Sequence, residues 1–231
     1  MIPLHDDNPT QIFPYLTIGF IIACVLVFFW EISYGEEMQK AIYMLGAVPA
    51  TIFENKLLPP ELQIVPSWAT MVTSMFMHGG WMHLIGNMLY LWIYGNNVED
   101  CMGHVRFVVF YILCGLGAFL AHALTNTASE IPMVGASGAI SGVLGAYLLI
   151  YPHARILVVI PLGFYFHTMR LPAGVVIGFW FLLQFINSAM SGDEGGGVAW
   201  YAHIGGFLVG MALIPFFKYS HVTFFHPIRR A

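Results

Sequence analysis

Long stretches without a charged side chain constrain this chain more than any other feature of its sequence. Five gaps between consecutive charged residues hold 22 to 24 residues each. They separate Asp7 from Glu31, Arg106 from Glu130, Glu130 from Arg155, Arg170 from Asp193, and Glu194 from Lys218. A sixth stretch ends at Glu99, and its apolar part starts near Gly80. Because about 20 apolar residues in a helix cross the hydrocarbon core of a bilayer, each stretch can hold one transmembrane helix.

The sequence therefore predicts an all-α membrane protein with six transmembrane helices. We expect them near residues 12–33, 80–98, 106–126, 136–151, 172–190 and 199–217. A soluble protein with buried helices fits poorly, because only 9% of the residues are charged, against about 25% in a soluble domain. Soluble helices also carry one polar face, and these stretches are apolar all round. The first one lacks a preceding basic residue and a small-residue cleavage site, so we expect it to remain as an anchor.

No internal repeat or second soluble domain is visible. We expect a single transmembrane domain over residues 1–231, with a core at about 65–217 and a long first outer loop at 35–79. That loop is rich in proline and apolar residues, so it is expected to form short helices at the outer membrane surface.

Lysine and arginine are concentrated on one side of the expected membrane. With six spans, both ends of the chain share a side with the second and fourth loops. Six of the eight basic residues lie there: Arg106, Arg155, Arg170, Lys218, Arg229 and Arg230. The positive-inside rule makes this side cytoplasmic, as in a multi-pass protein of the cell (inner) membrane. The lipid bilayer and membrane proteins are the expected partners, and nucleic acid is not.

A serine and a histidine lie near the outer ends of two of these expected helices. Ser137 follows the third loop and His203 follows the fifth, so both should lie at a similar depth below the outer surface. A serine hydroxyl becomes a nucleophile when a base accepts its proton, and imidazole is the usual base near neutral pH. The pair therefore points to attack on a carbonyl group, as in peptide-bond hydrolysis.

Three further polar residues are expected at the same depth, at the outer end of the second helix. His83 and Asn87 are four residues apart, so they share one helix face. Both side chains can donate a hydrogen bond to an oxyanion, as can the backbone N–H of Ser137. His78 lies roughly 140° around a helix from His83, so we expect it to face the first loop or to mark the start of the helix.

Glycines accompany both reactive candidates. Gly135 and Gly138 flank Ser137, and Gly206 and Gly210 follow His203 as a pair of small residues four apart. This spacing allows helix backbones to approach closely, which a serine and a histidine on separate helices need in order to form a hydrogen bond.

These motifs together resemble the rhomboid family of intramembrane serine proteases, in its minimal six-helix bacterial form. Gly135-Ala136-Ser137-Gly138 resembles the family's G-x-S-G box. His203, Gly206 and Gly210 are similar to its H-x-x-G-x-x-x-G on the last core helix. The segment 78–87 resembles its H-x-x-x-x-H-x-x-x-N signature, and Gly95, Val98 and Glu99 match the end of that helix.

The resemblance implies a role for each of these residues. Ser137 would be the nucleophile and His203 the general base of a dyad that has no carboxylate. His83, Asn87 and the Ser137 N–H would form the oxyanion hole, with no cofactor and no metal. The substrates would be single-span membrane proteins, cut near the outer face and usually after a small residue. The sequence agrees in that Glu99 is expected at the inner surface and Asp193 and Glu194 in the outer loop, so no carboxylate is expected at the depth of Ser137.

Two positions depart from the family pattern. The family often has Trp-Arg in the first loop, and here Trp68 is followed by Ala69. An aromatic residue four positions after the nucleophile often packs on the catalytic histidine, and here that position is Ser141. Another residue must then orient His203, and Trp200 or Tyr201 is the expected substitute.

Other functions remain open at this stage. His104, His122, His153 and His167 raise the alternative of a membrane metal- or haem-binding protein, because imidazole is a common ligand. A second alternative is a non-catalytic rhomboid-like protein that binds transmembrane clients. Ser137 taken alone commonly bonds the carbonyl four residues earlier, and Asn87 also suits hydrogen bonding between helices. Glu99 and Asp100 are expected to form an interfacial cap or ion pair.

Overall fold

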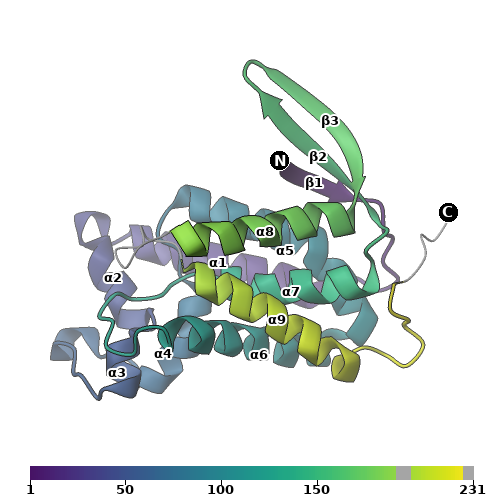
Figure 1. Ribbon diagram of the computed structural model, residues 1–231. Coiled ribbons are helices and arrows are strands. Elements are labelled where there is room, and N and C mark those ends of the chain that lie inside the picture. The colour runs from purple at the N-terminus through teal and green to yellow at the C-terminus, as the bar shows by residue number, and fades with distance from the viewer. Residues whose placement is uncertain (191–198, 226–231) are drawn as a thin grey trace.

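The protein is described by a computed structural model that covers residues 1–190 and 199–225. Four charged residues of the pattern above, Asp193, Glu194, Arg229 and Arg230, lie outside the described residues. Long helices occur in all six expected stretches (Figure 1). They are α1 (Tyr15–Ile32), α5 (Trp81–Met102), α6 (His104–Ala123), α7 (Ser137–Ile150), α8 (Ala173–Met190) and α9 (Trp200–Phe217).

Three of these helices are long and apolar enough to cross a membrane by length and composition. They are α1, α6 and α9, with mean hydropathies of 2.2, 1.8 and 1.5. Helix α7 and residues 173–188 of α8 are apolar but shorter. The chain is thus a mostly helical membrane protein with three candidate spans, and the count of six spans stays a prediction.

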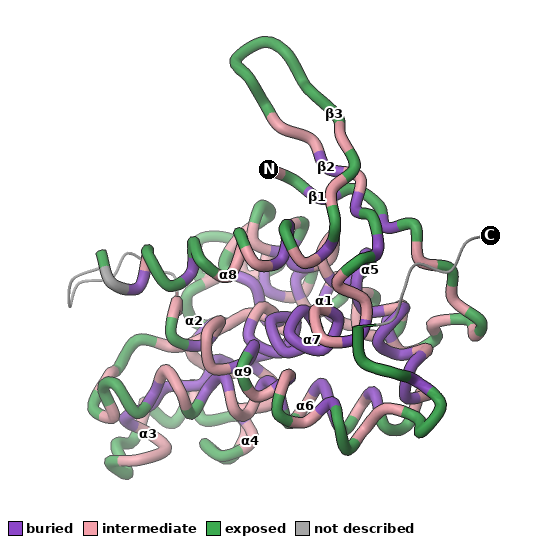
Figure 2. Tube along the Cα trace, turned by 45° about the vertical axis from the view of Figure 1, so that its right-hand side comes forward, coloured by how far each residue is buried: buried purple, intermediate pink, exposed green. Residues whose placement is uncertain are grey.

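Helix α7 lies at the centre of the bundle. It packs against α5, α6 and α9, and Figure 2 shows it as a nearly continuous buried segment. Every residue from Gly138 to Tyr147 is buried. Glycine at positions 138, 142 and 145 allows this close packing, because an added Cβ at each position would meet a neighbouring helix. The residue at the start of α7 is therefore held by the best-packed helix of the fold.

The first turn of α1 is capped by the Glu99 carboxylate of α5 rather than by a residue of its own. Glu99 is fully buried and accepts hydrogen bonds from the N–H groups of Leu16 and Thr17, at 3.0 and 2.8 Å. Asp100 accepts hydrogen bonds from the N–H groups of Gln11 and Ile12. The bonds to Glu99 satisfy N–H groups that a helix start leaves free, whereas those to Asp100 hold the segment before α1. Glu99 thus forms the expected cap, and the interfacial position of Glu99 and Asp100 stays a prediction.

The long first loop forms short helices. These are η1 (Gly35–Glu37), α2 (Met38–Leu45), α3 (Pro49–Phe53), η2 (Pro60–Leu62), α4 (Ser67–Thr73) and η3 (Ser74–Phe76), where η marks a 3-10 helix. The expectation of short helices in this loop is confirmed, and their depth relative to a membrane stays a prediction.

A three-stranded antiparallel sheet departs from the all-α expectation. Strands β1 (Ile2–Asp6), β2 (Arg155–Leu162) and β3 (Tyr165–Pro172) pair in the order β1-β2-β3. The segment expected to be a plain inner loop contains a β-branched run that favours a strand. Gly163 then starts a two-residue turn with a φ of +65°, as hairpin turns require.

The sheet is fastened to the bundle through β1. The hydroxyl of Tyr147, in α7, donates a 2.7 Å hydrogen bond to the buried carboxyl of Asp6. Burial raises the pKa of Asp6 to about 6. Next to it, Asp7 forms a 2.6 Å ion pair with Arg170 of β3. The first residues of the chain therefore lie at the end of the bundle opposite Ser137.

Candidate active site

Ser137 and His203 meet between α7 and α9. Ser137 is the first residue of α7, and His203 lies in the first turn of α9. The Oγ of Ser137 is 2.8 Å from the Nε2 of His203, which is within hydrogen-bond range. Both side chains are partly buried. The hydroxyl thus pairs with the imidazole of another helix rather than with the carbonyl four residues before it.

The glycines of α9 make this contact possible. A Cβ on Gly206 would overlap the carbonyl oxygen of Gly138. A Cβ on Gly210 would lie 2.5 Å from both the carbonyl carbon and the Cα of Gly142. The two backbones are therefore in direct contact, which sets the spacing that the Ser137–His203 hydrogen bond requires.

The segment before Ser137 is tied to the first loop. Met133 and Ala47 exchange two backbone hydrogen bonds of 2.8 and 3.0 Å, and the N–H of Gly135 donates to the carbonyl of Ser74 at 2.9 Å. Gly135 has a φ of +124°, which side chains disfavour. A Cβ there would lie 2.7 Å from the Nε2 of His83. Glycine at 135 thus lets the His83 ring approach the loop that leads to Ser137.

Asn87 lies one turn beyond His83 on the same face of α5. It is 8% exposed, and its Nδ2 has no hydrogen-bond partner among the described residues. A buried donor without a partner costs free energy. The Asn87 amide is therefore suited to donate a hydrogen bond to an oxygen atom of a ligand. The N–H of Ser137 belongs to the first turn of α7, where helix geometry provides no partner.

His78 is fully buried and holds the segment that leads into α5. Its backbone N–H donates to both carboxylate oxygens of Glu31, at 3.1 and 3.0 Å. The rings of His78 and His83 are 5.1 Å apart. The sequence-based expectation that no carboxylate lies at this depth was wrong, because Glu31 ends α1 beside this segment. Glu31 binds the backbone of His78, however, and not the imidazole of His203.

The groups that surround His203 were largely missed by the sequence analysis. Its Nδ1 lies 2.8 Å from the Oε1 of Gln184 in α8. The rings of Trp180 and Trp200 lie 6.0 and 6.1 Å from the imidazole. Trp200 was one expected substitute for the missing aromatic residue, whereas Tyr201 is 46% exposed. A polar residue inside an apolar helix was the available signal for Gln184.

Ser141 makes a local bond rather than a contact with His203. Its Oγ donates a 2.6 Å hydrogen bond to the carbonyl of Ser137, the usual pattern for a serine in a transmembrane helix. Ser141 therefore takes no part in orienting the imidazole.

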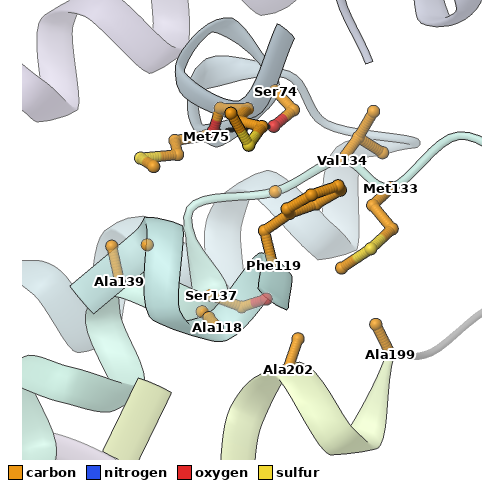
Figure 3. Close-up of a pocket in the computed structure, with 14 residues that line it drawn as sticks. Ser74, Met75, Ala118, Phe119, Met133, Val134, Ser137, Ala139, Ala199 and Ala202 are labelled. Atoms are coloured by element: carbon orange, nitrogen blue, oxygen red, sulfur yellow. Dashed lines mark hydrogen bonds between the residues drawn. The ribbon is translucent and has the colours of Figure 1, made fainter. Parts of the chain in front are cut away.

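A narrow apolar cavity adjoins Ser137. Figure 3 shows the Ser137 side chain at its wall, between α7 and the first turn of α9. Its other walls include Met75, Ala118, Phe119, Met133, Ala199 and Ala202. Such a cavity suits a small apolar side chain of a bound peptide.

The remaining histidines are dispersed. His104 pairs with Glu99 at the far end of α5. Within residues 1–190 and 199–225, no group of three or more His, Cys, Asp or Glu side chains is arranged to hold a metal ion.

Comparisons with known proteins identify a family to which the chain is similar. A family model of the Rhomboid domain matches residues 65–220. The chain is 31% identical over 201 residues to Rhomboid protease GluP of Bacillus subtilis. The aligned region covers 87% of this chain and 35% of that protein. It is 29% identical over 179 residues to the mitochondrial Rhomboid protein 1 of Saccharomyces cerevisiae, covering 75% of this chain and 49% of that one. It is 26% identical over 147 residues to Rhomboid protease AarA of Providencia stuartii, covering 58% of this chain and 50% of that protein.

The chain thus spans about a third to a half of the length of these relatives. The match of the domain model over most of the chain confirms the resemblance seen in the sequence motifs. This protein belongs to the rhomboid family.

Proposed function

We propose that this protein is an intramembrane serine endopeptidase that cleaves transmembrane segments of other membrane proteins. The observation that carries the proposal is the 2.8 Å approach of the Ser137 Oγ to the His203 Nε2. A hydroxyl and an imidazole at this distance form a nucleophile and its general base. The protease names of two relatives, from Bacillus subtilis and Providencia stuartii, support the same activity.

The reaction proceeds through an acyl-enzyme. The Nε2 of His203 accepts the proton of the Ser137 hydroxyl while Oγ attacks the carbonyl carbon of the scissile peptide bond. The imidazolium then gives this proton to the leaving amine as the C–N bond breaks. Water, activated by the same imidazole, attacks the ester and regenerates the serine.

Three donors stabilise the oxyanion of each tetrahedral intermediate. They are the N–H of Ser137, the Nδ2 of Asn87 and a ring N–H of His83. The unpartnered, buried Nδ2 of Asn87 supports this role, since fixed donors aimed at a developing charge lower the barrier without reorganising.

The proposal includes a substrate class and a membrane orientation. The apolar cavity beside Ser137 receives a small side chain next to the scissile bond. Single-span membrane proteins supply such a segment once the helix unwinds near the outer face.

The N–H of Tyr219, after α9, donates to the carbonyl of Cys101 at the end of α5, so the segment after α9 lies at the same end as the start of α1. In a cell (inner) membrane this end is cytoplasmic.

Cleavage of single-span reporter proteins in liposomes tests the proposal. The wild type should cut a fraction of a reporter panel, and Ser137→Ala and His203→Ala should cut none while folding normally. A fluorophosphonate probe should label the wild type at Ser137.

Ser74→Ala is a matched control, because Ser74 lines the same cavity and, among the described residues, its hydroxyl has one hydrogen bond, to the Met71 carbonyl at 3.4 Å. It should retain cleavage and labelling. Turnover that persists in Ser137→Ala would refute the assignment. Binding of reporters without cleavage or labelling in the wild type would favour the non-catalytic, client-binding alternative.

A further inference from the structure

The imidazole of His203 needs a defined tautomer to act as a base. Its Nε2 must present a lone pair to the Ser137 hydroxyl, so the ring proton must lie on Nδ1. Position 141, where the family often has an aromatic residue, holds a serine that bonds the Ser137 carbonyl instead. Some other group must therefore fix the proton and the ring plane.

Gln184 supplies a hydrogen-bond acceptor that can fix the proton and the ring plane. Its side chain is 6% exposed, and its Nε2 donates a 3.2 Å hydrogen bond to the carbonyl of Trp180. This bond fixes the orientation of the amide and leaves Oε1 facing the Nδ1 of His203 at 2.8 Å. An amide oxygen only accepts hydrogen bonds, so Nδ1 must carry the proton. The reverse orientation would place the amide oxygen against the Trp180 carbonyl.

Two indole rings restrict the same imidazole from the sides. Trp180 lies at 6.0 Å with its plane tilted by 39°, and Trp200 lies at 6.1 Å with its plane at 85°. The rings limit tilting, and the Gln184 bond limits rotation about the Cβ–Cγ bond of His203. Trp180 and Gln184 occupy successive turns of α8, so one helix supplies both restraints.

Resting on the proposed function, we propose that Gln184 is a positioning residue that completes a Ser137–His203–Gln184 relay. It holds the tautomer in which the Nε2 of His203 accepts the serine proton. A neutral amide orients the ring as a triad carboxylate does, but it adds no negative charge to the site.

Gln184→Met is the test, because methionine has a similar length and lacks an acceptor of comparable strength. We expect kcat for a reporter to fall by ~10- to 100-fold, as for partial loss of general-base catalysis. KM should change by less than about twofold, because no substrate contact is removed. Phe185→Leu, at the next and lipid-exposed position of α8, is the matched control and should retain the wild-type kcat.

A second measurement reads the tautomer without any substrate. In ¹⁵N-histidine NMR spectra, the His203 signal, identified by its loss in His203→Ala, should report the Nδ1–H form in the wild type. Gln184→Met should shift the ring toward the Nε2–H form. An unchanged tautomer, or an unchanged kcat, would overturn the role of Gln184. An inactive wild type that still shows the Nδ1–H form would instead count against the proposed function alone.

A different part of the molecule supports a second, independent proposal. The outer half of the β2–β3 hairpin is apolar and fully outside the core. Leu162, Phe164, Tyr165 and Phe166 are 60, 102, 80 and 72% exposed. Such a cluster marks a surface that contacts another apolar medium.

The position of the hairpin indicates which medium this is. Figures 1 and 2 both show it rising from the end of the bundle and sloping back over α8. Helix α8 itself exposes Val175, Phe179 and Leu182, as a lipid-facing helix does. The two arginines of the hairpin, Arg155 and Arg170, lie near its base, away from the aromatic tip.

We propose that this tip rests in the interface of the bilayer on the side opposite Ser137. Phenylalanine and tyrosine favour that level of a membrane. The free edge of β3 keeps the hairpin from entering the hydrocarbon, where unpaired backbone groups are too costly.

Site-directed spin labelling tests this placement. The native cysteines Cys24, Cys101 and Cys114 are buried, so a nitroxide should attach to Phe164→Cys selectively. In liposomes its accessibility to oxygen should exceed that to a nickel chelate, as at the lipid-facing control Leu26→Cys. The opposite ratio, as at the exposed control His221→Cys, would overturn the proposal, and so would shielding from both reagents, which indicates a protein partner.

Discussion

Gly210→Ala probes whether the contact of α7 and α9 sets the geometry of the candidate active site. The new methyl carbon would lie 2.5 Å from the Cα and the carbonyl carbon of Gly142. An ordinary contact between such atoms is about 3.4 Å or longer. The carbonyl oxygen of Gly142 would lie closer still. Helix α9 must therefore move away from α7 by at least ~0.9 Å, because these neighbouring atoms belong to the backbone and cannot rotate aside.

This displacement is large compared with the tolerance of the hydrogen bond between Ser137 and His203. Added to the 2.8 Å between Oγ and Nε2, it gives about 3.7 Å, which is outside hydrogen-bond range. We expect kcat to fall by ~10²-fold or more, as for loss of a general base. Overpacking should also lower the free energy of unfolding by ~1–3 kcal/mol.

Reporter cleavage in liposomes and thermal unfolding in detergent measure the two effects separately. Gly19→Ala in α1 and Gly178→Ala in α8 are the controls, because a Cβ at either position meets nothing within 4 Å. Both should keep the wild-type kcat. A folded Gly210→Ala protein with a kcat within about threefold of the wild type would refute the argument that backbone contact positions the dyad.

Three other changes test separate parts of the structure. Asn87→Ala removes one of the three proposed oxyanion donors, so kcat should fall by ~10²-fold or less; an unchanged kcat would leave Asn87 as a structural residue. Gly135→Ala forces a side chain into a φ of +124° and against His83, so fluorophosphonate labelling should slow markedly; labelling at the wild-type rate would contradict the tight fit. Burial raises the pKa of Asp6 to about 6 from 3.8, so the protonated carboxyl stabilises the fold, and this stabilisation is lost as the pH rises through about 6. Asp6→Asn keeps a partner for Tyr147 and should weaken the fall in unfolding temperature between about pH 4 and 6, the range between the unfolded and folded pKa values of Asp6; an equal fall in both proteins would locate the titrating group elsewhere.

The helices and the contact between Ser137 and His203 were predictable because their signals are local and repeated. A charge-free stretch of 22 to 24 residues allows little besides a membrane helix, and the structure has a helix in each of the six. Ser137 and His203 could be paired because each begins its helix from the same expected side. The glycines at 206 and 210 then indicated that the two helices touch.

Other features depend on contacts that no local pattern encodes. Gln184 is visible in the sequence as a polar residue within an apolar helix, but its partner 19 residues later is fixed by how α8 packs on α9. Glu31 was treated as the end of an apolar stretch, although a carboxylate there needs a donor and finds it in the His78 backbone. The hairpin was missed because its apolar residues face both the core and the surface, so they show no alternating pattern.

The proposed neutral relay suits this site because the site lies inside the helix bundle. A carboxylate beside His203 would have to be buried in a low-dielectric environment, which costs several kcal/mol unless it is fully paired. An amide avoids that cost and still accepts the Nδ1 proton, and its own N–H group is satisfied by the Trp180 carbonyl. Among the described residues, the carboxylate of Glu31 lies near His78 and accepts two hydrogen bonds from the His78 backbone N–H. In the proposed mechanism the positive charge on the imidazole forms together with the negative charge on the substrate oxyanion, so no carboxylate is needed to balance it.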